Sequence, residues 1–304
     1  EADIYVVEID SIELNKLGSR FNKINAEAFL ILKKIHKKIS PNYISQLEWL
    51  NHIKEVKNSL PILESIHKSS DNQYINSYQF ISELGSKARR NTTFITDMGT
   101  ALISGFQILN MKDEQKLFTS QGLGEMGYGL PGAIGAWFAD QSRDIICLNC
   151  DGGLMMNLQE LHSVISNNIP MKIIIFNNDG YLMIKHTQNA ILKGRRAGTD
   201  SKSGLTCPNY CKLVQSLGFT YLRISELNNM DKIIFDFLNN SGPVVLEVFM
   251  PKEQPLVPKS ALSITSTGGL TSLPLEDLSP LISLSKLKKY LSIKILQKSF
   301  RAKR

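Results

Sequence analysis

Asp151, Gly152 and Gly153 end an apolar run of the chain, within the stretch IICLNCDGGLMMNL at 145–158. A charge is costly beside a buried strand and glycine stabilises neither strand nor helix, so this turn indicates a bound ligand. Asn178 follows a second apolar run, after room for one helix and one return strand. Carboxylate and amide oxygens suit Mg²⁺, and glycine amides before a helix suit phosphate, so the two turns favour a magnesium–diphosphate site. The alternative is that both side chains only cap helices.

The strands that position these turns are short runs rich in β-branched residues. They alternate with amphipathic, helix-like segments, and their side chains are apolar on both faces. This pattern predicts an α/β fold, a parallel sheet covered by helices on both faces. Ligands bind such sheets at the carboxyl ends of strands, so the turns at 97–99, 151–153 and 177–180 are expected to converge. The predicted strands are 92–96, 144–149, 171–177, 219–224 and 242–250.

The chain divides into four segments. Residues 1–38 begin within a strand and continue into a helical pattern, which predicts the tail of a second, truncated α/β domain. Residues 39–76 are polar and broken by prolines, as is typical of a connector. The catalytic domain is expected over 77–255, and residues 256–304 are expected to form a C-terminal extension with a basic tail.

The segment 150–184, CDGGLMMNLQELHSVISNNIPMKIIIFNNDGYLMI, resembles the signature of thiamine-diphosphate-dependent enzymes. That signature is a Gly-Asp-Gly turn followed by a helix, a strand and Asn-Asn. The resemblance implies the thiamine-diphosphate-binding fold, with Mg²⁺ held by Asp151, Asn178 and the backbone carbonyl of Gly180, and the cofactor diphosphate held by the metal. One position departs, because Cys150 stands where the family has glycine. If that position needs a positive φ, the cysteine costs about 1 kcal/mol or more.

A second stretch, GLGEMGYGLPGAIGAWFA from Gly122, is similar to a segment of acetolactate synthases and related 2-oxo acid decarboxylases. A bulky residue there holds the cofactor in a bent conformation, which implies this catalytic role for Met126. The carbonyl of Gly124 and the amide of Met126 would bind the aminopyrimidine ring. The alternatives are core filling for Met126 and a dinucleotide-binding G-x-G-x-x-G for the glycines. The resemblance also implies cofactor contacts from Gly99, Thr100, Gly152, Gly153 and Met183.

The activity that the resemblance implies is decarboxylation of a small 2-oxo acid followed by carboligation, as in acetolactate synthases. A simple 2-oxo acid decarboxylase, a catalytically silent cofactor- or partner-binding domain and an unrelated phosphate-binding protein are the alternatives. The family also needs a glutamate on a pyrimidine-binding domain, for which these residues offer no candidate. We therefore expect the fragment alone to be inactive. A homo-oligomer (dimer or tetramer) of a longer chain, or a separate subunit, would complete the enzyme.

Some residues leave a question open at this stage. FAD is bound by some members of the family, but here it is not supported, since Glu8 and Glu27 are doubtful positions for it. Lys185, His186 and Arg195 follow the Asn-Asn turn, and any of them could face a substrate carboxylate.

Composition and charge argue against nucleic acid and membrane as partners. The 304 residues are 42% hydrophobic and 21% charged, which is ordinary for a globular protein. The net charge of +7 lies in the last segment, which has many basic and no acidic residues from Leu281 on. A cytoplasmic location is expected, because no basic-then-apolar leader pattern opens the sequence. The C-x-x-C spacing of Cys147 and Cys150 is too weak to indicate zinc, so reduced thiols are expected, as for Cys207 and Cys211.

Overall fold

The computed structural model describes residues 3–39, 47–69, 73–260, 262–264 and 270–291. The chain forms two compact units, Glu1–Leu60 and Pro61–Arg304. The division falls inside the segment 39–76 that we expect to be a connector, and the proposed domain boundaries stay predictions. Most of the basic tail lies outside the described residues.

The first unit contains a small parallel pair of strands. Strands β1 (Ile4–Glu8) and β2 (Phe21–Asn25) pair in parallel, joined by α1 (Ser11–Asn15). Helices α2 (Ala28–Lys38) and α3 (Leu47–Ser59) follow. Leu14 is the one buried hydrophobic residue among those described in this unit. The β–α–β order agrees with an α/β segment.

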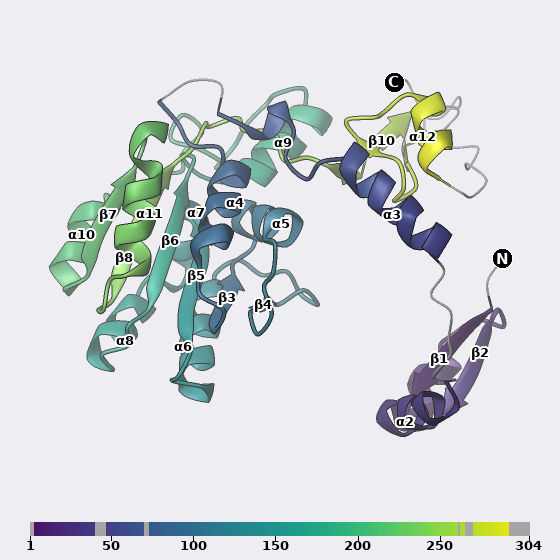
Figure 1. Ribbon diagram of the computed structural model, residues 1–304. Helices are drawn as coiled ribbons and strands as arrows, with labels where there is room; N and C mark the ends of the chain where they lie inside the picture. Colours follow the sequence, from purple (N-terminus) through teal and green to yellow (C-terminus); the bar gives the residue numbers. More distant parts are fainter. Residues whose placement is uncertain (1–2, 40–46, 70–72, 261, 265–269, 292–304) are drawn as a thin grey trace. The chain divides into compact units, whose positions relative to one another are not determined.

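The second unit is built on a six-stranded sheet in which every pairing is parallel (Figure 1). Its order is β4-β3-β5-β6-β8-β7, and five of the strands lie where the sequence pattern places them. The edge strand β4 was not predicted, because three residues are too few to show a period. The strands are β3 (Thr92–Thr96), β4 (Lys116–Phe118), β5 (Asp144–Cys150), β6 (Lys172–Asn177), β7 (Thr220–Ile224) and β8 (Val244–Phe249).

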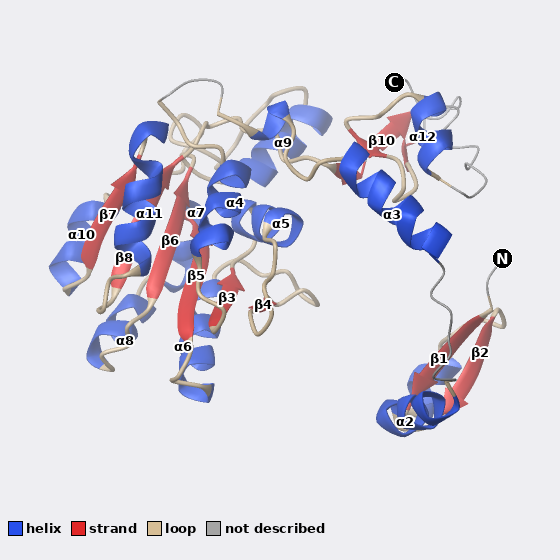
Figure 2. Cartoon of the chain, viewed as in Figure 1, coloured by secondary structure: helices blue, strands red, loops and turns tan. Residues whose placement is uncertain are grey.

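Helices cover both faces of this sheet (Figure 2). One core packs α4 (Ser77–Lys87), α5 (Thr100–Ile108) and α11 (Met230–Leu238) against one face. The other packs α6 (Gly129–Ala139), α8 (Glu160–Ser166) and α10 (Tyr210–Leu217) against the opposite face. The predicted α/β class is thereby confirmed, and burial on both sides explains the continuous apolar runs.

Alternation along β5 separates the two cysteines of the C-x-x-C pair. Cys147 packs in one core and Cys150 in the other, so their thiols lie on opposite faces of the sheet. All four cysteines are free thiols. Among the described residues, no group of three His, Cys, Asp or Glu side chains is placed to hold a metal ion.

Shorter elements complete the second unit. In the described part of the chain, no helix combines the length and apolarity needed to cross a membrane. The remaining helices are α7 (Asp151–Leu154), α9 (Leu182–Ile191), α12 (Leu284–Tyr290) and the 3₁₀ turns η1 (Ser65–His67), η2 (Met155–Asn157) and η3 (Leu227–Asn229). The remaining strands are the antiparallel pairs β9 (Lys259–Ser260) with β12 (Leu278–Ser279) and β10 (Leu262–Ile264) with β11 (Leu270–Ser272).

Candidate functional site

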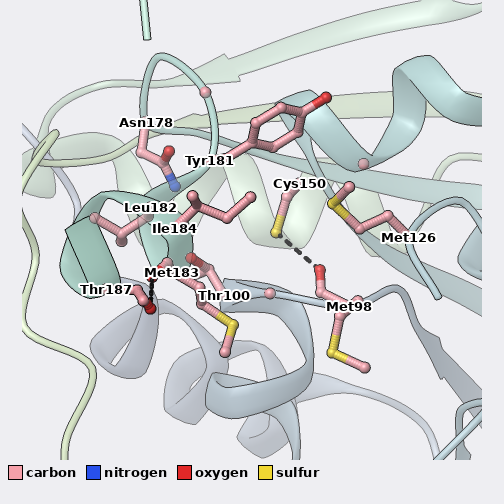
Figure 3. Close-up of a pocket in the computed structure, with 13 residues that line it drawn as sticks. Met98, Thr100, Met126, Cys150, Asn178, Tyr181, Leu182, Met183, Ile184 and Thr187 are labelled. Carbon is pink, nitrogen blue, oxygen red and sulfur yellow. Dashed lines mark hydrogen bonds between the residues drawn. The ribbon is translucent and has the colours of Figure 1, made fainter. Parts of the chain in front are cut away.

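The turns after β3, β5 and β6 meet at one edge of the sheet, as the strand pattern predicts. A cavity of about 310 Å³ opens there. Figure 3 shows Thr100 from the first turn, Cys150 from the second and Asn178 from the third around this cavity, with Met126 approaching from a separate segment. We call it the first cavity.

Asp151 is a buried carboxylate held by backbone amides. Its Oδ2 accepts hydrogen bonds from the amides of Asn178 (3.1 Å) and Gly180 (2.9 Å), and its Oδ1 accepts one from Gly152 (2.8 Å). The hydroxyl of Tyr210 donates to its backbone carbonyl. Burial raises the pKa of Asp151 to about 6, although these amide hydrogen bonds lower it. The amides place this carboxylate against the turn after the neighbouring strand, and a cation there would offset its lost hydration.

Asn178 offers an amide oxygen with nothing bound to it. Its side chain is buried, and Oδ1 has no hydrogen-bond partner among the described residues. A buried acceptor without a partner costs about 1–3 kcal/mol, so a ligand for it is expected. The donor set of a carboxylate and an amide oxygen fits Mg²⁺, with diphosphate and water as its other ligands.

Gly180 can only be glycine in this turn. Its φ is +116°, and a Cβ at this position would lie 2.3 Å from the carbonyl oxygen of Thr199. The amide of Tyr181 donates to that same oxygen at 2.9 Å. The segment after α9 therefore packs against the turn that would bind the metal.

The two glycines after Asp151 allow close packing. A Cβ on Gly152 would lie 2.3 Å from the ring of Tyr181, and one on Gly153 would lie 2.0 Å from Oδ2 of Asp97. Gly153 lines the first cavity, whereas the amide of Gly152 is bound to Asp151. Their contacts with phosphate stay a prediction.

The turn after β3 has features of an anion site. Gly99 has a φ of +97° and precedes α5, whose N-terminus carries a partial positive charge. Thr100 is buried, and its Oγ1 has no hydrogen-bond partner among the described residues. Both residues line the first cavity.

Cys150 is not strained, which corrects the expected cost of its departure from glycine. Its φ of −105° lies in the extended region, because it is still the last residue of β5. Its Sγ accepts a hydrogen bond from the amide of Ala101 (3.4 Å) and donates one to the carbonyl of Met98 (3.6 Å), the latter drawn in Figure 3. Burial raises the pKa of this thiol to about 12. The neutral thiol joins β5 to the turn after β3.

Asp97 is the first residue of the turn at 97–99, and the sequence pattern predicts no separate role for it. It is fully buried, and its Oδ1 accepts hydrogen bonds from the amides of Gly127 (2.7 Å) and Gly129 (3.3 Å). Burial raises its pKa, and these amides lower it. Asp97 thus holds the segment that carries Met126. An aspartate directly after a buried strand, as at Asp151, was the available signal.

Met126 lies at the cavity and not in the core. Its side chain is 38% exposed and lines the first cavity, so the core-filling alternative is wrong. Gly124 has a φ of +68°, and a Cβ there would lie 2.8 Å from Cε of Met98. Met183 also lines the cavity, from α9. The cofactor contacts of these residues stay predictions.

The three basic candidates after the Asn-Asn turn lie in different surroundings. Lys185 is fully buried, and its Nζ donates to the carbonyls of Asn178 (3.1 Å) and Asp179 (3.5 Å). His186 lines a second cavity, and Arg195 is exposed. Lys185 therefore binds the protein's own turn, which leaves His186 as the candidate facing a cavity.

Comparison with known proteins agrees with this site. Residues 97–248, half of the chain, match the family of thiamine pyrophosphate enzymes, C-terminal TPP binding domain. The chain is 29% identical over 285 residues to a probable acetolactate synthase large subunit of Methanococcus aeolicus, covering 88% of this chain and 45% of that protein. It is 30% identical over 217 residues to the mitochondrial acetolactate synthase of Schizosaccharomyces pombe, covering 70% and 32%.

A bacterial relative shows a similar coverage of both chains. The acetolactate synthase isozyme 2 large subunit of Escherichia coli K12 is 25% identical over 263 residues, covering 86% of this chain and 46% of that protein. The chain thus spans less than half the length of these relatives. The match excludes the dinucleotide-binding alternative and that of an unrelated phosphate-binding protein. The chain belongs to the thiamine pyrophosphate enzyme family and carries its C-terminal TPP binding domain.

Proposed function

We propose that the protein containing this chain uses thiamine diphosphate and Mg²⁺ to decarboxylate one 2-oxo acid and to join the remaining acyl unit to a second. The observation that carries the proposal is a pair of residues at the sheet edge. Asp151 is fully buried, and Asn178, after the neighbouring strand, has an amide oxygen without a hydrogen-bond partner in the described part of the chain. Both belong to a domain of the thiamine pyrophosphate family. The acetolactate synthases among its relatives favour carboligation over simple decarboxylation.

The metal ligands would be Asp151, Asn178 and the backbone carbonyl of Gly180. A carboxylate has about four acceptor positions. The three amides bound to Asp151 use two on Oδ2 and one on Oδ1, so Oδ1 keeps a position for the ion. Oδ1 of Asn178 accepts no hydrogen bond from any residue that the structure describes. Two side chains and a carbonyl leave places for diphosphate oxygens and water, as Mg²⁺ requires.

The cofactor would extend from this metal to Met126. Thiamine diphosphate, when bound, supplies a carbon nucleophile and an electron sink for the loss of CO₂. The start of α5, with Gly99 and the free Thr100 hydroxyl, would bind the diphosphate together with Gly152 and Gly153. Met126 would hold the cofactor bent, and the Gly124 carbonyl and Met126 amide would bind its aminopyrimidine ring. Met183 would contact it from α9.

We also propose that a further polypeptide segment completes the site. The pyrimidine-binding domain with its glutamate would come from the rest of a longer chain, in a homo-oligomer, or from a separate subunit. The name "large subunit" of several relatives supports an assembly of subunits. A cytoplasmic location is proposed as well, although some relatives are named as mitochondrial.

Product analysis tests the proposed function. The complete enzyme, supplied with pyruvate, thiamine diphosphate and Mg²⁺, is expected to release CO₂ and form an acetohydroxy acid. Residues 1–304 alone are expected to do neither. If acetaldehyde is the main product, the reaction is a simple decarboxylation and the proposed carboligation is wrong. Cofactor binding without CO₂ release from any 2-oxo acid would favour the silent binding domain.

A further inference from the structure

Asn177, the first residue of the Asn-Asn turn at 177–180, holds the backbone of that turn with its own side chain. Its Oδ1 accepts a hydrogen bond of 3.2 Å from the amide of Asp179. Asp179 has a φ of +62° and is followed by Gly180 with a φ of +116°. Left-handed backbone is unfavourable for a residue with a side chain, so contacts must stabilise it. The Asn177 oxygen supplies one of these contacts.

The amide group of Asn177 has a donor end and an acceptor end, and Glu247 decides which way it points. Nδ2 of Asn177 donates to Oε1 of Glu247 at 2.6 Å. A carboxylate only accepts hydrogen bonds, so it binds the nitrogen end and leaves Oδ1 for Asp179. Strand pairing makes the contact possible. Glu247 on β8 lies opposite Ile175 on β6, and residues two apart on a strand share a face.

Tyr221 holds the other oxygen of the same carboxylate. From the edge strand β7, its hydroxyl donates to Oε2 of Glu247 at 2.5 Å. Burial and this carboxylate raise the pKa of Tyr221, so the hydroxyl keeps its proton and stays a donor. The neighbouring strands β6, β8 and β7 (Figure 1) thus each contribute one member to the row Asn177–Glu247–Tyr221.

Glu247 carries a charge where burial makes a charge costly. Its side chain is 4% exposed, and none of the ion pairs between described residues includes it. Arg223 lies opposite Glu247 on β7, but its guanidinium is placed over the ring of Phe249, 4.5 Å from the centroid. What the carboxylate provides, and an apolar residue would not, is a fixed acceptor for Asn177.

The turn that this row supports carries the groups proposed to bind the metal. Its three successive amides, at 178, 179 and 180, are all bound. Asp151 accepts the first and the third, and Asn177 accepts the middle one. Loss of the middle contact would leave the carbonyl of Gly180 and the side chain of Asn178 less well placed for an ion.

We propose that Glu247 is a positioning residue for the metal site, because it fixes the direction of the Asn177 amide and thereby the turn that would bind Mg²⁺. Glu247 does not line the first cavity, so it acts through Asn177. Tyr221 supports Glu247 in this role. The assignment rests on the proposed function, since it concerns the metal of that site.

The test reverses the hydrogen bond between the two side chains in the complete enzyme. Calorimetric titration with thiamine diphosphate at a series of Mg²⁺ concentrations gives the Mg²⁺ concentration that half-saturates cofactor binding. Asn177→Asp sets two carboxylates against each other and should raise this value about 10-fold, the effect of roughly one hydrogen bond. Adding Glu247→Gln restores the wild-type charge, and its amide can donate to the new carboxylate and accept from Tyr221. The double variant should return to within about 3-fold of wild type.

Val245→Ala is the matched control, because Val245 is buried two residues before Glu247 on the same face of β8. It should lower the melting temperature of the enzyme without cofactor but leave the Mg²⁺ requirement unchanged. Tyr221→Phe removes only a hydroxyl and should raise the requirement about 3-fold, which decides the question if Asn177→Asp does not fold.

Three outcomes would overturn the positioning role and leave the proposed function standing. They are a double variant no better than Asn177→Asp, a wild-type Mg²⁺ requirement in Tyr221→Phe, and an equal rise in the control Val245→Ala. A different result would contradict the proposed function itself: cofactor binding to the wild-type enzyme that does not depend on Mg²⁺ at all.

Discussion

Lys185 on α9 donates a hydrogen bond of 3.1 Å to the carbonyl oxygen of Asn178, the residue seven positions before it. The ammonium group is completely buried, and burial lowers its pKa while Glu253, Asp151 and other acids raise it. The helix after the Asn-Asn turn therefore binds the turn that precedes it. This contact holds the backbone of Asn178 in place.

Replacement of Lys185 is expected to loosen this turn. Lys185→Met keeps the length of the side chain but leaves the buried carbonyl of Asn178 and the partly buried carbonyl of Asp179 without this donor. We expect a loss of about 1–3 kcal/mol in the free energy of unfolding and weaker joint binding of thiamine diphosphate and Mg²⁺. Chemical denaturation and calorimetry measure the two effects. Lys212→Met, at an exposed position of α10, is the control and should change neither.

Thiamine diphosphate and Mg²⁺ together should raise the melting temperature of this chain, because a ligand bound only to the native state stabilises it. Neither alone should give the full shift, and EDTA should reverse it. Asp151→Ala is expected to abolish the shift. Asp113→Ala, which removes a carboxylate that is 93% exposed, should retain it. A wild-type transition that saturating cofactor and metal do not move would contradict the proposed site.

Cys150→Gly should not improve binding, since Cys150 has no backbone strain to relieve. Glycine removes the thiol contacts with Ala101 and Met98 and adds chain entropy within a strand, so a loss of about 1–2 kcal/mol in stability is expected. Thermal denaturation and cofactor titration of the variant measure both. Tighter binding by the glycine variant would show that the cysteine weakens the site.

Met126→Ala should lower the turnover of the complete enzyme more than its affinity for the cofactor. In the proposed site Met126 would act at the reacting end of the cofactor, whereas Asp151 and Asn178 would hold the metal that binds the diphosphate. The variant should therefore lose the reacting geometry and keep most of its affinity for the cofactor. A fall of about 10-fold or more in kcat, with the cofactor dissociation constant within about 3-fold of wild type, is expected. Met111→Ala, of similar exposure (39%) but outside both cavities, serves for comparison. Equal losses in both variants would refute the role of Met126.

The central strands and the meeting of their polar turns could be predicted because burial on both faces leaves continuous apolar runs. Pattern alone could not show that Cys150 stays extended, since φ depends on where β5 ends. The sequence pattern also could not show where the basic side chains of α9 lie. Lys185 and His186 are neighbours in sequence, yet Lys185 is buried and binds the Asn-Asn turn, whereas His186 lines the second cavity. The role of Asp97 depends on a contact with Gly127 across 30 positions.

The parallel pairing of β5 with β6 sets Cys150 opposite Phe176. The separation of Asp151 from Asn178 is therefore fixed by this register, and a slip of one residue would shift them by about 3.3 Å. The length of chain between the strands does not enter that geometry. Insertions in the exposed turn after α8, around Asn167, should be tolerated, whereas a single-residue deletion within β5 or β6 should eliminate metal binding.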